Sequence, residues 1–375
     1  MKGPMRTVAA LTVLLLTACR PSAEPVRIGL AGPFSDPVVG APMRKAAELA
    51  VEEVNSAGGI GGRPIELIAR DDRGDPDSAV SVAADLVAEG VVAVVGHVFS
   101  GTTLAAAPVY GAATIPIPVI TPSSTAPELA QAGRHVFRLC PTDLEHGAAL
   151  ATWIRQGLKL TRAAVLYLNN PYGRGVRQSF VTRFMALGGV ILESDPYLGD
   201  SPDVGTFLDR IKAHGQAELL VVAGNRTEAL AVLNAARSRG ILLPVFGGDG
   251  LEGIELDGAI AEGTTLTAAY FPTLDTPQNQ RFVRTYLAKY PGSGQPNQPA
   301  AATYDAIFLL RDVIGAAGSN RRAITTALTT LGGDIPPYQG VTGILAFDGQ
   351  GDLARMKVLI GVVKNGTVVQ VERSP

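Results

Sequence analysis

Hydroxyl groups and a helix start follow two apolar runs in the first third of this 375-residue sequence. Ser100 comes after the run 91–95, and a helical pattern begins there. Ser123, Ser124 and Thr125 come after the next apolar run. Hydroxyls and the unpaired N–H groups of a helix N-terminus can bind a carboxylate, because both donate hydrogen bonds and the helix dipole favours negative charge there.

A carboxylate, an amide and an aromatic phenol stand after similar runs in the middle of the sequence. These residues are Asp249, Asn225 and Tyr172. The Asp249 carboxylate can pair with an ammonium group, and Tyr172 and Phe99 can form apolar or stacking walls. An amino acid carries both a carboxylate and an ammonium group. The two sets together therefore predict a site for a small amino-acid-like ligand.

Each of these residues has a simpler explanation when it is taken alone. Serine and threonine after a strand commonly cap the N-terminus of the next helix and need not touch a ligand. The combination favours a binding site, because hydroxyls, an amide and a carboxylate occur at successive strand ends, where ligands of doubly wound sheets bind.

The elements that carry these residues alternate between strands and helices. Apolar runs predict the strands, and apolar residues at helical spacing predict the helices between them. Strands that are apolar throughout and alternate with helices indicate parallel sheets covered on both faces. The alternation occurs twice, with strands at 26–31, 65–69, 91–95 and 118–120, and then at 163–168, 190–193, 219–222 and 244–247. We therefore predict an α/β fold with two doubly wound parallel-sheet lobes.

The last third of the sequence does not begin a third lobe. Three helices are predicted at 281–290, 300–314 and 321–331, with one adjacent strand at 264–268. The end of the chain predicts a β-hairpin, 357–363 and 367–371, because Asn365-Gly366 is a favoured two-residue turn. A hairpin must join an existing sheet to be stable. The chain is therefore expected to cross between the lobes several times.

The N-terminus is typical of a lipoprotein signal peptide. Lys2 and Arg6 precede the apolar run 8–16, which is too short to span a bilayer. The segment 16–19 then resembles a lipobox, so we expect a signal peptide over 1–18, a lipid on Cys19 and a tether over 19–25. An ordinary secretory signal with a coincidental cysteine is the alternative. We expect the mature protein in the periplasm or on the outer face of the cell membrane.

Composition and residue spacing argue against several other functions. Charged residues make up 18% of the chain and the formal net charge is -2, so no basic excess favours nucleic acid. The four histidines and two cysteines show no metal-ligand spacing. Cys140 is expected to be a buried structural thiol. We predict neither a metal nor a cofactor.

Two motifs imitate nucleotide-binding and enzymatic signatures. The segment 248–253 matches G-x-G-x-x-G, but the helix that a dinucleotide site needs is interrupted at Gly258. Ser100 does not lie in a G-x-S-x-G nucleophile elbow, and no base accompanies it. We therefore predict no catalytic residue. A hydrolase that uses Ser100 is the alternative, and turnover of a bound ligand would support it.

A set of short motifs lies along the chain, at 28–35, 51–60, 71–72, 94–101, 121–129, Tyr172-Gly173 and 347–352. Together these motifs resemble the leucine/isoleucine/valine-binding family of periplasmic solute-binding proteins of ABC transporters. The resemblance covers the chain from Val26 to its end.

The resemblance implies a type I periplasmic-binding fold whose hinge has three crossovers. It implies an N-lobe of 26–141 with 269–345 and a C-lobe of 142–268 with 346–375. It also implies that Ser100, Ser123 and Thr125 hold an α-carboxylate, that Asp249 holds an α-amino group, and that Tyr172 lines the pocket. The implied partners are the ligand and an ABC permease, with the lipid anchor in the membrane, and we expect a monomer.

The sequence departs from the family pattern at the ligand. A pocket tyrosine often found after the first strand has no counterpart between Pro37 and Met43, and Asn225 stands where branched-chain binders often have an aromatic residue. A loop disulfide of some members is absent, since Arg73 and Phe99 stand near those positions. A branched-chain amino acid is the first interpretation. The alternative is a ligand sensor of the same fold that binds an amide, urea or another amino acid.

Overall fold

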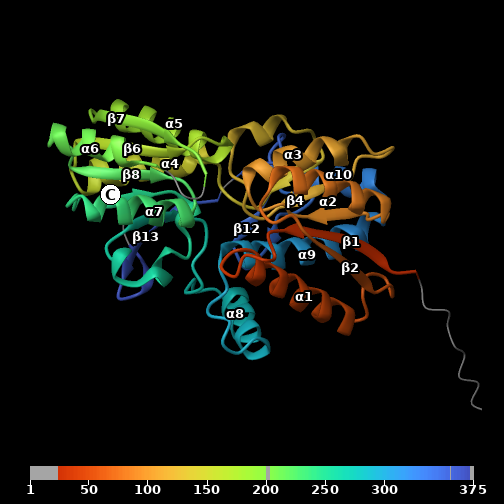
Figure 1. The fold of residues 1–375 in the computed structure, drawn as a ribbon. Helices are drawn as coiled ribbons and strands as arrows, with labels where there is room; N and C mark the ends of the chain where they lie inside the picture. Colours follow the sequence, from red (N-terminus) through yellow and green to blue (C-terminus); the bar gives the residue numbers. More distant parts are fainter. Residues whose placement is uncertain (1–23, 200–202, 355, 372–375) are drawn as a thin grey trace, which may run out of the picture.

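The computed structural model describes residues 24–199, 203–354 and 356–371. The predicted signal peptide 1–18, the lipidation site Cys19 and most of the tether 19–25 lie outside these residues. Figure 1 shows the described chain as two α/β lobes that lie side by side.

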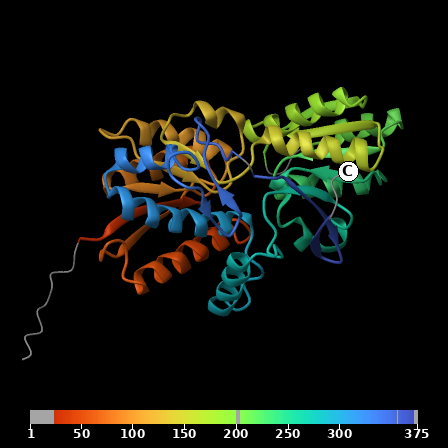
Figure 2. The same ribbon diagram turned by 180° about the vertical axis from the view of Figure 1, so that it is seen from behind.

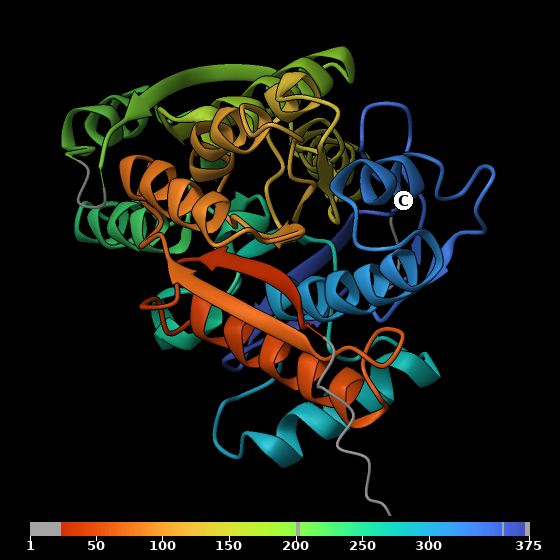
Figure 3. The ribbon, with the colours of Figure 1, turned by 90° about the vertical axis from the view of Figure 1, so that its right-hand side faces the viewer.

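The first lobe, which we call the N-lobe, is built on a parallel sheet of strand order β2-β1-β3-β4-β5. Helices α1 and α9 cover one face of this sheet, and α2 and α3 cover the other. Figure 3 shows α1 and α2 on opposite sides of β1 and β2. Successive side chains of a strand point to opposite faces, so Leu30 and Val95 pack under α1 and α9 while Val94 packs under α2 and α3. The strands are β1 Val26–Gly32, β2 Ile65–Asp71, β3 Ala93–Val95, β4 Val119–Thr121 and β5 Val136–Arg138, and the helices are α1 Gly40–Ser56, α2 Pro76–Ala88, α3 Ser100–Gly111 and α9 Gln298–Ala317.

The second lobe, the C-lobe, is built on a sheet of order β14-β13-β10-β9-β8-β6-β7. Its central strands are parallel, and β13 joins β10 in antiparallel orientation. Helices α4 and α5 cover one face, and α6 and α7 cover the other. The strands are β6 Arg162–Leu168, β7 Val190–Tyr197, β8 Leu219–Ala223, β9 Val245–Gly247, β10 Thr265–Ala268, β13 Leu359–Lys364 and β14 Thr367–Gln370, and the helices are α4 Asp143–Thr152, α5 Pro171–Ala186, α6 Gly205–His214 and α7 Arg226–Ser238.

The chain passes between the lobes three times, which confirms the predicted fold class. It leaves the N-lobe after β5, returns after β10, and leaves again between Leu353, in the N-lobe core, and β13. Figure 2 shows the blue C-terminal segment making the third passage. Helix α8 (Pro277–Lys289) and helix α10 (Arg321–Thr329) pack in the N-lobe core. The remaining short elements are β11 Tyr338–Gln339, β12 Ile344–Leu345, η1 Pro127–Gln131, η2 Trp153–Gly157, η3 Asp249–Leu251 and η4 Ile254–Ile260.

The predicted C-terminal hairpin is confirmed. Strands β13 and β14 pair antiparallel, and the turn residues Asn365 and Gly366 both have positive φ, at 52° and 72°. Asparagine and glycine tolerate this left-handed conformation, which a two-residue hairpin turn requires. The segment after β9 also has the predicted break, since Gly258 has φ 67° and ψ -138° inside η4.

Several helices begin before their apolar periodicity, and α1 and α8 are two of them. The apolar spacing of α1 starts at Met43, but the helix begins at Gly40, after a turn in which the Asp36 carboxylate accepts hydrogen bonds from the N–H groups of Val38 and Val39. Helix α8 begins at Pro277, where the Thr276 side chain accepts a hydrogen bond and caps the helix.

Candidate functional site

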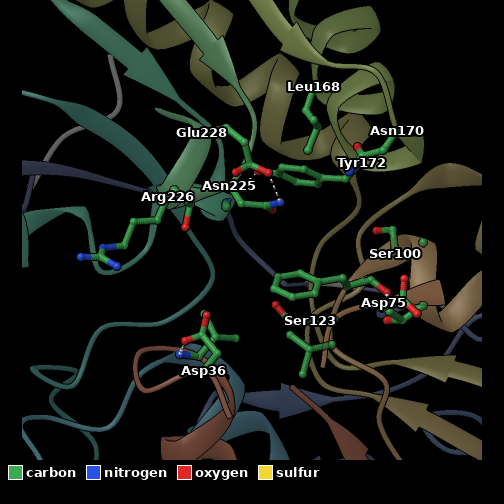
Figure 4. A pocket seen from close by; sticks show the side chains of 18 of the residues that line it. Asp36, Asp75, Ser100, Ser123, Leu168, Asn170, Tyr172, Asn225, Arg226 and Glu228 are labelled. Atoms are coloured by element: carbon green, nitrogen blue, oxygen red, sulfur yellow. Dashed lines mark hydrogen bonds between the residues drawn. The ribbon is translucent and has the colours of Figure 1, made fainter. Parts of the chain in front are cut away.

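A cavity of about 600 Å³ lies between the two lobes. Its size is within the range of small-molecule sites. The N-lobe contributes residues from the loops after β3 and β4, and the C-lobe contributes residues from the loops after β6, β8 and β9. Figure 4 shows the two groups of side chains on opposite sides of this space. The cavity therefore occupies the carboxyl ends of the strands in both sheets, as expected for doubly wound lobes.

Six of the eight predicted binding residues line this cavity, and they come from both lobes. They are Phe99, Ser100, Ser123, Tyr172, Asn225 and Asp249. Ser124 and Thr125 are buried and do not line it. The Ser124 hydroxyl lies 2.9 Å from the carbonyl oxygen of Val98, to which it donates a hydrogen bond. Contact of Ser124 and Thr125 with a ligand stays a prediction.

The N-lobe side of the cavity is organised to donate hydrogen bonds. Helix α3 starts at Ser100, and the first N–H groups of a helix have no intrahelical partner. The residue before the helix, Phe99, does not cap these groups with its side chain. The Ser100 Oγ accepts hydrogen bonds from the N–H groups of Thr125 at 3.2 Å and Ala126 at 3.1 Å. Because both lone pairs are then occupied, its own proton is available to an acceptor. A carboxylate matches this wall.

The C-lobe side presents an oriented carboxylate. The Tyr172 hydroxyl donates to Asp249 Oδ1 at 3.0 Å and accepts a hydrogen bond from the N–H of Gly250 at 2.7 Å. Burial, and then the charge of Asp249, raise the pKa of Tyr172 well above its usual range, so the phenol stays a donor. This arrangement orients the Asp249 carboxyl group in the cavity wall, where a carboxylate would match an ammonium group.

The glycines around Asp249 explain the G-x-G-x-x-G match without a nucleotide. A Cβ at Gly248 or Gly250 would lie 2.5 Å from the Tyr172 hydroxyl oxygen or 2.7 Å from the Tyr172 ring. Both positions therefore need glycine so that Tyr172 can approach Asp249. The motif serves the contact between α5 and the loop after β9.

A buried polar cluster lies behind the cavity, where the chain first crosses between the lobes. Arg138 Nη1 donates to the carbonyl oxygens of Thr125 and Ala126, each at 2.9 Å. The Asp143 N–H donates to the same Thr125 carbonyl at 2.9 Å. His146 Nε2 lies 3.8 Å from Asp249 Oδ2. The cluster thus ties the loop after β4 to the first turn of α4.

Sequence reasoning missed this cluster. Neither Asp143 oxygen has a partner at hydrogen-bonding geometry among the described residues, and burial raises the pKa of Asp143 well above its usual range. The available signal was local: Thr142 and Glu145 form a capping box that begins α4 at Asp143. That signal gives the helix start and not the contacts with Thr125 and Asp249, which are distant in sequence.

Other chemistry finds little support in the described part of the chain. Cys140 is buried, as predicted, and burial raises the pKa of its thiol well above the usual range. Residues 24–199, 203–354 and 356–371 contain no group of His, Cys, Asp and Glu side chains that could hold a metal ion. None of the helices in those ranges combines the length and apolar character that a membrane span requires.

The three-crossover fold and a cavity between two lobes define a bilobal ligand-binding protein. A family model described as "Periplasmic binding protein" matches residues 25–367. The chain belongs to this family, which is one of binding proteins, and the predicted relationship to the leucine/isoleucine/valine-binding proteins is confirmed.

Individual relatives are similar over nearly their full length. The "Leu/Ile/Val-binding protein homolog 1" of Brucella suis is 30% identical over 335 residues, which cover 87% of each chain. The "Leucine-, isoleucine-, valine-, threonine-, and alanine-binding protein" of Pseudomonas aeruginosa is 28% identical over 355 residues, or 93% of this chain and 92% of that one. The crystal structure of LivJ, a branched-chain amino acid transporter substrate-binding protein of Streptococcus pneumoniae in complex with isoleucine, superposes with a TM-score of 0.81 at 27% identity and covers 93% of this chain and 100% of the other.

Proposed function

We propose that this protein is the extracytoplasmic substrate-binding protein of an ABC importer and that it captures an amino acid in the inter-lobe cavity. The observation that carries the proposal is the two-sided chemistry of that cavity. Hydrogen-bond donors at the start of α3 face an oriented carboxylate, Asp249, which Tyr172 holds on the other lobe. The names of the relatives make branched-chain amino acids the first ligands to test.

Binding is coupled to closure of the lobes. Ser100 and Ser123 belong to one lobe and Asp249 to the other, so a zwitterion gains its full set of contacts only when both lobes reach it. Such a ligand binds the closed form more tightly than the open form and shifts the population towards it. We propose that Ser124 and Thr125 join the carboxylate site in that closed form, and that Phe99 and Asn225 contact the ligand.

The lobes that move are assigned as the sequence predicts, except at the third crossing. We assign 26–141 with 269–353 to the N-lobe unit, and 142–268 with the chain from β13 onward to the C-lobe unit. The predicted boundary after residue 345 is moved because Phe347 and Leu353 pack in the N-lobe core. We further propose that Cys19 carries a lipid after removal of residues 1–18, that the protein acts as a monomer, and that its membrane partner is the permease of the importer. Replacement of Cys19 by serine should release the protein from membranes.

The ligand is tested with a thermal-shift panel of amino acids, amides, urea and small carboxylates, followed by calorimetry. We expect only compounds with both an ammonium and a carboxylate group to raise the melting temperature. Calorimetry should show one bound ligand per chain. Small-angle X-ray scattering should show a smaller radius of gyration in the bound form. Stabilisation by ligands without an ammonium group would contradict the role of Asp249. Conversion of the bound ligand to a product would contradict the assignment as a binding protein.

A further inference from the structure

The part of the cavity in the C-lobe is bordered by two asparagines from neighbouring strands. Strands β6 and β8 pair in parallel, with Tyr167 beside Ala223. Asn170 follows β6 and Asn225 follows β8, and both line the cavity. Figure 4 shows them on the same side of the cavity as Tyr172. Any side chain of a ligand held between Ser100 and Asp249 that extends towards these strand ends meets two amide groups.

The orientation of each amide follows from its neighbour. Asn170 Oδ1 accepts a hydrogen bond from the N–H of Gly173 at 2.8 Å, which turns its Nδ2 away from the helix. Asn225 Nδ2 lies 3.5 Å from Glu228 Oε1. The flipped amide would place Asn225 Oδ1 against that carboxylate and repel it. Asn170 therefore offers a donor, Nδ2, and Asn225 offers an acceptor, Oδ1, to the cavity.

The pair is complementary to one class of side chain. We propose, on the basis of the function proposed above, that the ligand is an amino acid whose side chain ends in an amide or urea group, as in glutamine or citrulline. The carbonyl oxygen of such a group accepts from Asn170 Nδ2, and its N–H group donates to Asn225 Oδ1. Glu228, which lies beside Asn225 and also lines the cavity, is a second acceptor on that side and so favours the N–H end there.

Other side chains leave a mismatch. A branched aliphatic side chain removes water from both amides and replaces no hydrogen bond, which weakens binding on the order of tenfold for each group. A carboxylate side chain only accepts hydrogen bonds, so it finds no donor in Glu228 or in the Asn225 oxygen. An ammonium or guanidinium side chain matches Asn225 but places donors against the Asn170 donor.

The inference is tested by calorimetry with glutamine, asparagine, citrulline, leucine, glutamate and lysine. We expect at least one of the three amide or urea ligands to bind ten times more tightly than leucine, glutamate and lysine. Asn225→Leu, which removes the acceptor and adds apolar surface, should weaken that ligand at least tenfold and bind leucine as well as or better than the wild type.

The matched control is Asn234→Leu, the same substitution at an exposed position of α7 that does not line the cavity. It should leave all affinities unchanged. If leucine binds more tightly than all three amide or urea ligands, or if Asn225→Leu leaves the ratio of affinities unchanged, the inference is wrong while the proposed amino-acid binder stands. If the folded protein binds no amino acid, the proposed function itself is wrong and the inference falls with it.

Discussion

Asp249 is placed by contacts from another element rather than by its own loop. The Tyr172 hydroxyl bridges the Asp249 carboxylate and the Gly250 N–H, so the orientation of the anion depends on the first turn of α5. A carboxylate that is already oriented loses less entropy when it pairs with an ammonium group than one that must first be ordered. Ligand affinity should therefore depend strongly on Asp249. It should depend on Tyr172 indirectly, because Tyr172 orients the Asp249 carboxylate.

Replacement of Asp249 by alanine is expected to weaken amino-acid binding at least a hundredfold. A charge-assisted hydrogen bond in a closed cleft is lost, and the ammonium group stays buried without a partner, which costs about 2–5 kcal/mol. Calorimetry with the ligand found in the panel measures this loss. Asp209→Ala is the control, because Asp209 is exposed on α6 and pairs with Arg239 at the surface. Wild-type affinity in Asp249→Ala would contradict the site.

Six of the residues that line the cavity could be predicted from the sequence, whereas the polar residues behind them could not. Ser100 and Asp249 follow strands, and the position after a strand of a doubly wound sheet is sufficient to place a side chain at the cleft. Arg138 and Asp143 act through contacts with the loop after β4. No spacing in the sequence reports such contacts, because they depend on how the first crossing lies against that loop.

Helix α5 lies close to the ends of its sheet because glycine occupies its third position. A Cβ at Gly173 would lie 2.1 Å from the carbonyl oxygen of Leu168 and 2.8 Å from that of Ala223. These are backbone atoms that cannot rotate away. The absence of a side chain at Gly173 is thus what allows the neighbouring Tyr172 to reach Asp249.

Substitution of Gly173 by alanine should displace the start of α5 and lower both stability and affinity. Overpacking of this kind costs about 1–3 kcal/mol, and the loss of the contact between Tyr172 and Asp249 should weaken the ligand about tenfold or more. Thermal denaturation and calorimetry on the same sample measure the two effects.

The control for that experiment is Gly315→Ala in α9. A Cβ there meets only Ile60 at 4.0 Å, so the substitution should stabilise the protein by about 0.5–1 kcal/mol through the better helix propensity of alanine. Equal changes of stability and affinity in Gly173→Ala and Gly315→Ala would show that the close approach of Gly173 to the strand ends does not determine the position of α5.

At the level of elements, the sequence predicts helices and strands well in their centres and less well at their starts. The apolar pattern places α1 and α8 correctly, yet both begin earlier, at residues fixed by Asp36 and Thr276. Apolar periodicity reports which residues are buried. The first turn of a helix is instead decided by polar caps, whose side chains often lie outside the periodic segment.

Considered as a whole, the molecule has a hinge in which distant segments are bound together. Arg138, at the end of β5 just before the first crossing, pairs with Asp352, just before the third, with Nε and Oδ1 2.5 Å apart and the arginine side chain 2% exposed. Its Nη1 also binds the carbonyl oxygens of Thr125 and Ala126. One buried guanidinium therefore connects two crossings with a loop near the cleft.

Arg138→Met is expected to lower the melting temperature on the order of 10 °C. Removing one partner of a buried ion pair leaves Asp352 and the Ala126 carbonyl group without the donor that Arg138 supplies, and costs about 3–5 kcal/mol. The same substitution at Arg27, whose pair with Glu66 is exposed, should change the melting temperature by about 2 °C at most. Similar losses of melting temperature in the two variants would show that the pair of Arg138 and Asp352 stabilises the protein no more than an exposed ion pair does.

A contact between the lobes should respond to pH. The Glu252 carboxyl, after β9, accepts a hydrogen bond from the Gln298 N–H at the start of α9. Burial raises the pKa of Glu252 to about 8, from an ordinary value of 4.5. The folded protein thus holds this proton more tightly than the unfolded chain, so the contribution to stability is complete below about pH 4.5 and is lost as the pH rises through about 8.

Glu252→Gln keeps the acceptor oxygen and cannot ionise. Its melting temperature should equal that of the wild type near about pH 5 and exceed it by several degrees near about pH 9. Thermal denaturation across this pH range checks the difference. The exposed Glu48→Gln on α1 is the control, and it should follow the wild type throughout. A variant that loses stability with rising pH as steeply as the wild type would contradict the assignment.

The three passages of the chain also constrain the order in which the protein can assemble. Helix α9 covers the face of the N-lobe sheet that contains Leu30 and Val95, yet the ribosome makes it only after nearly all of the C-lobe. Until then only α1 covers this apolar face, so the part that α9 will cover stays exposed, and exposed apolar surface promotes aggregation. Fragments that end before Gln298 should therefore be insoluble when expressed alone. A circular permutant that begins near residue 269 would place α8 and α9 ahead of β1 and should relieve that exposure.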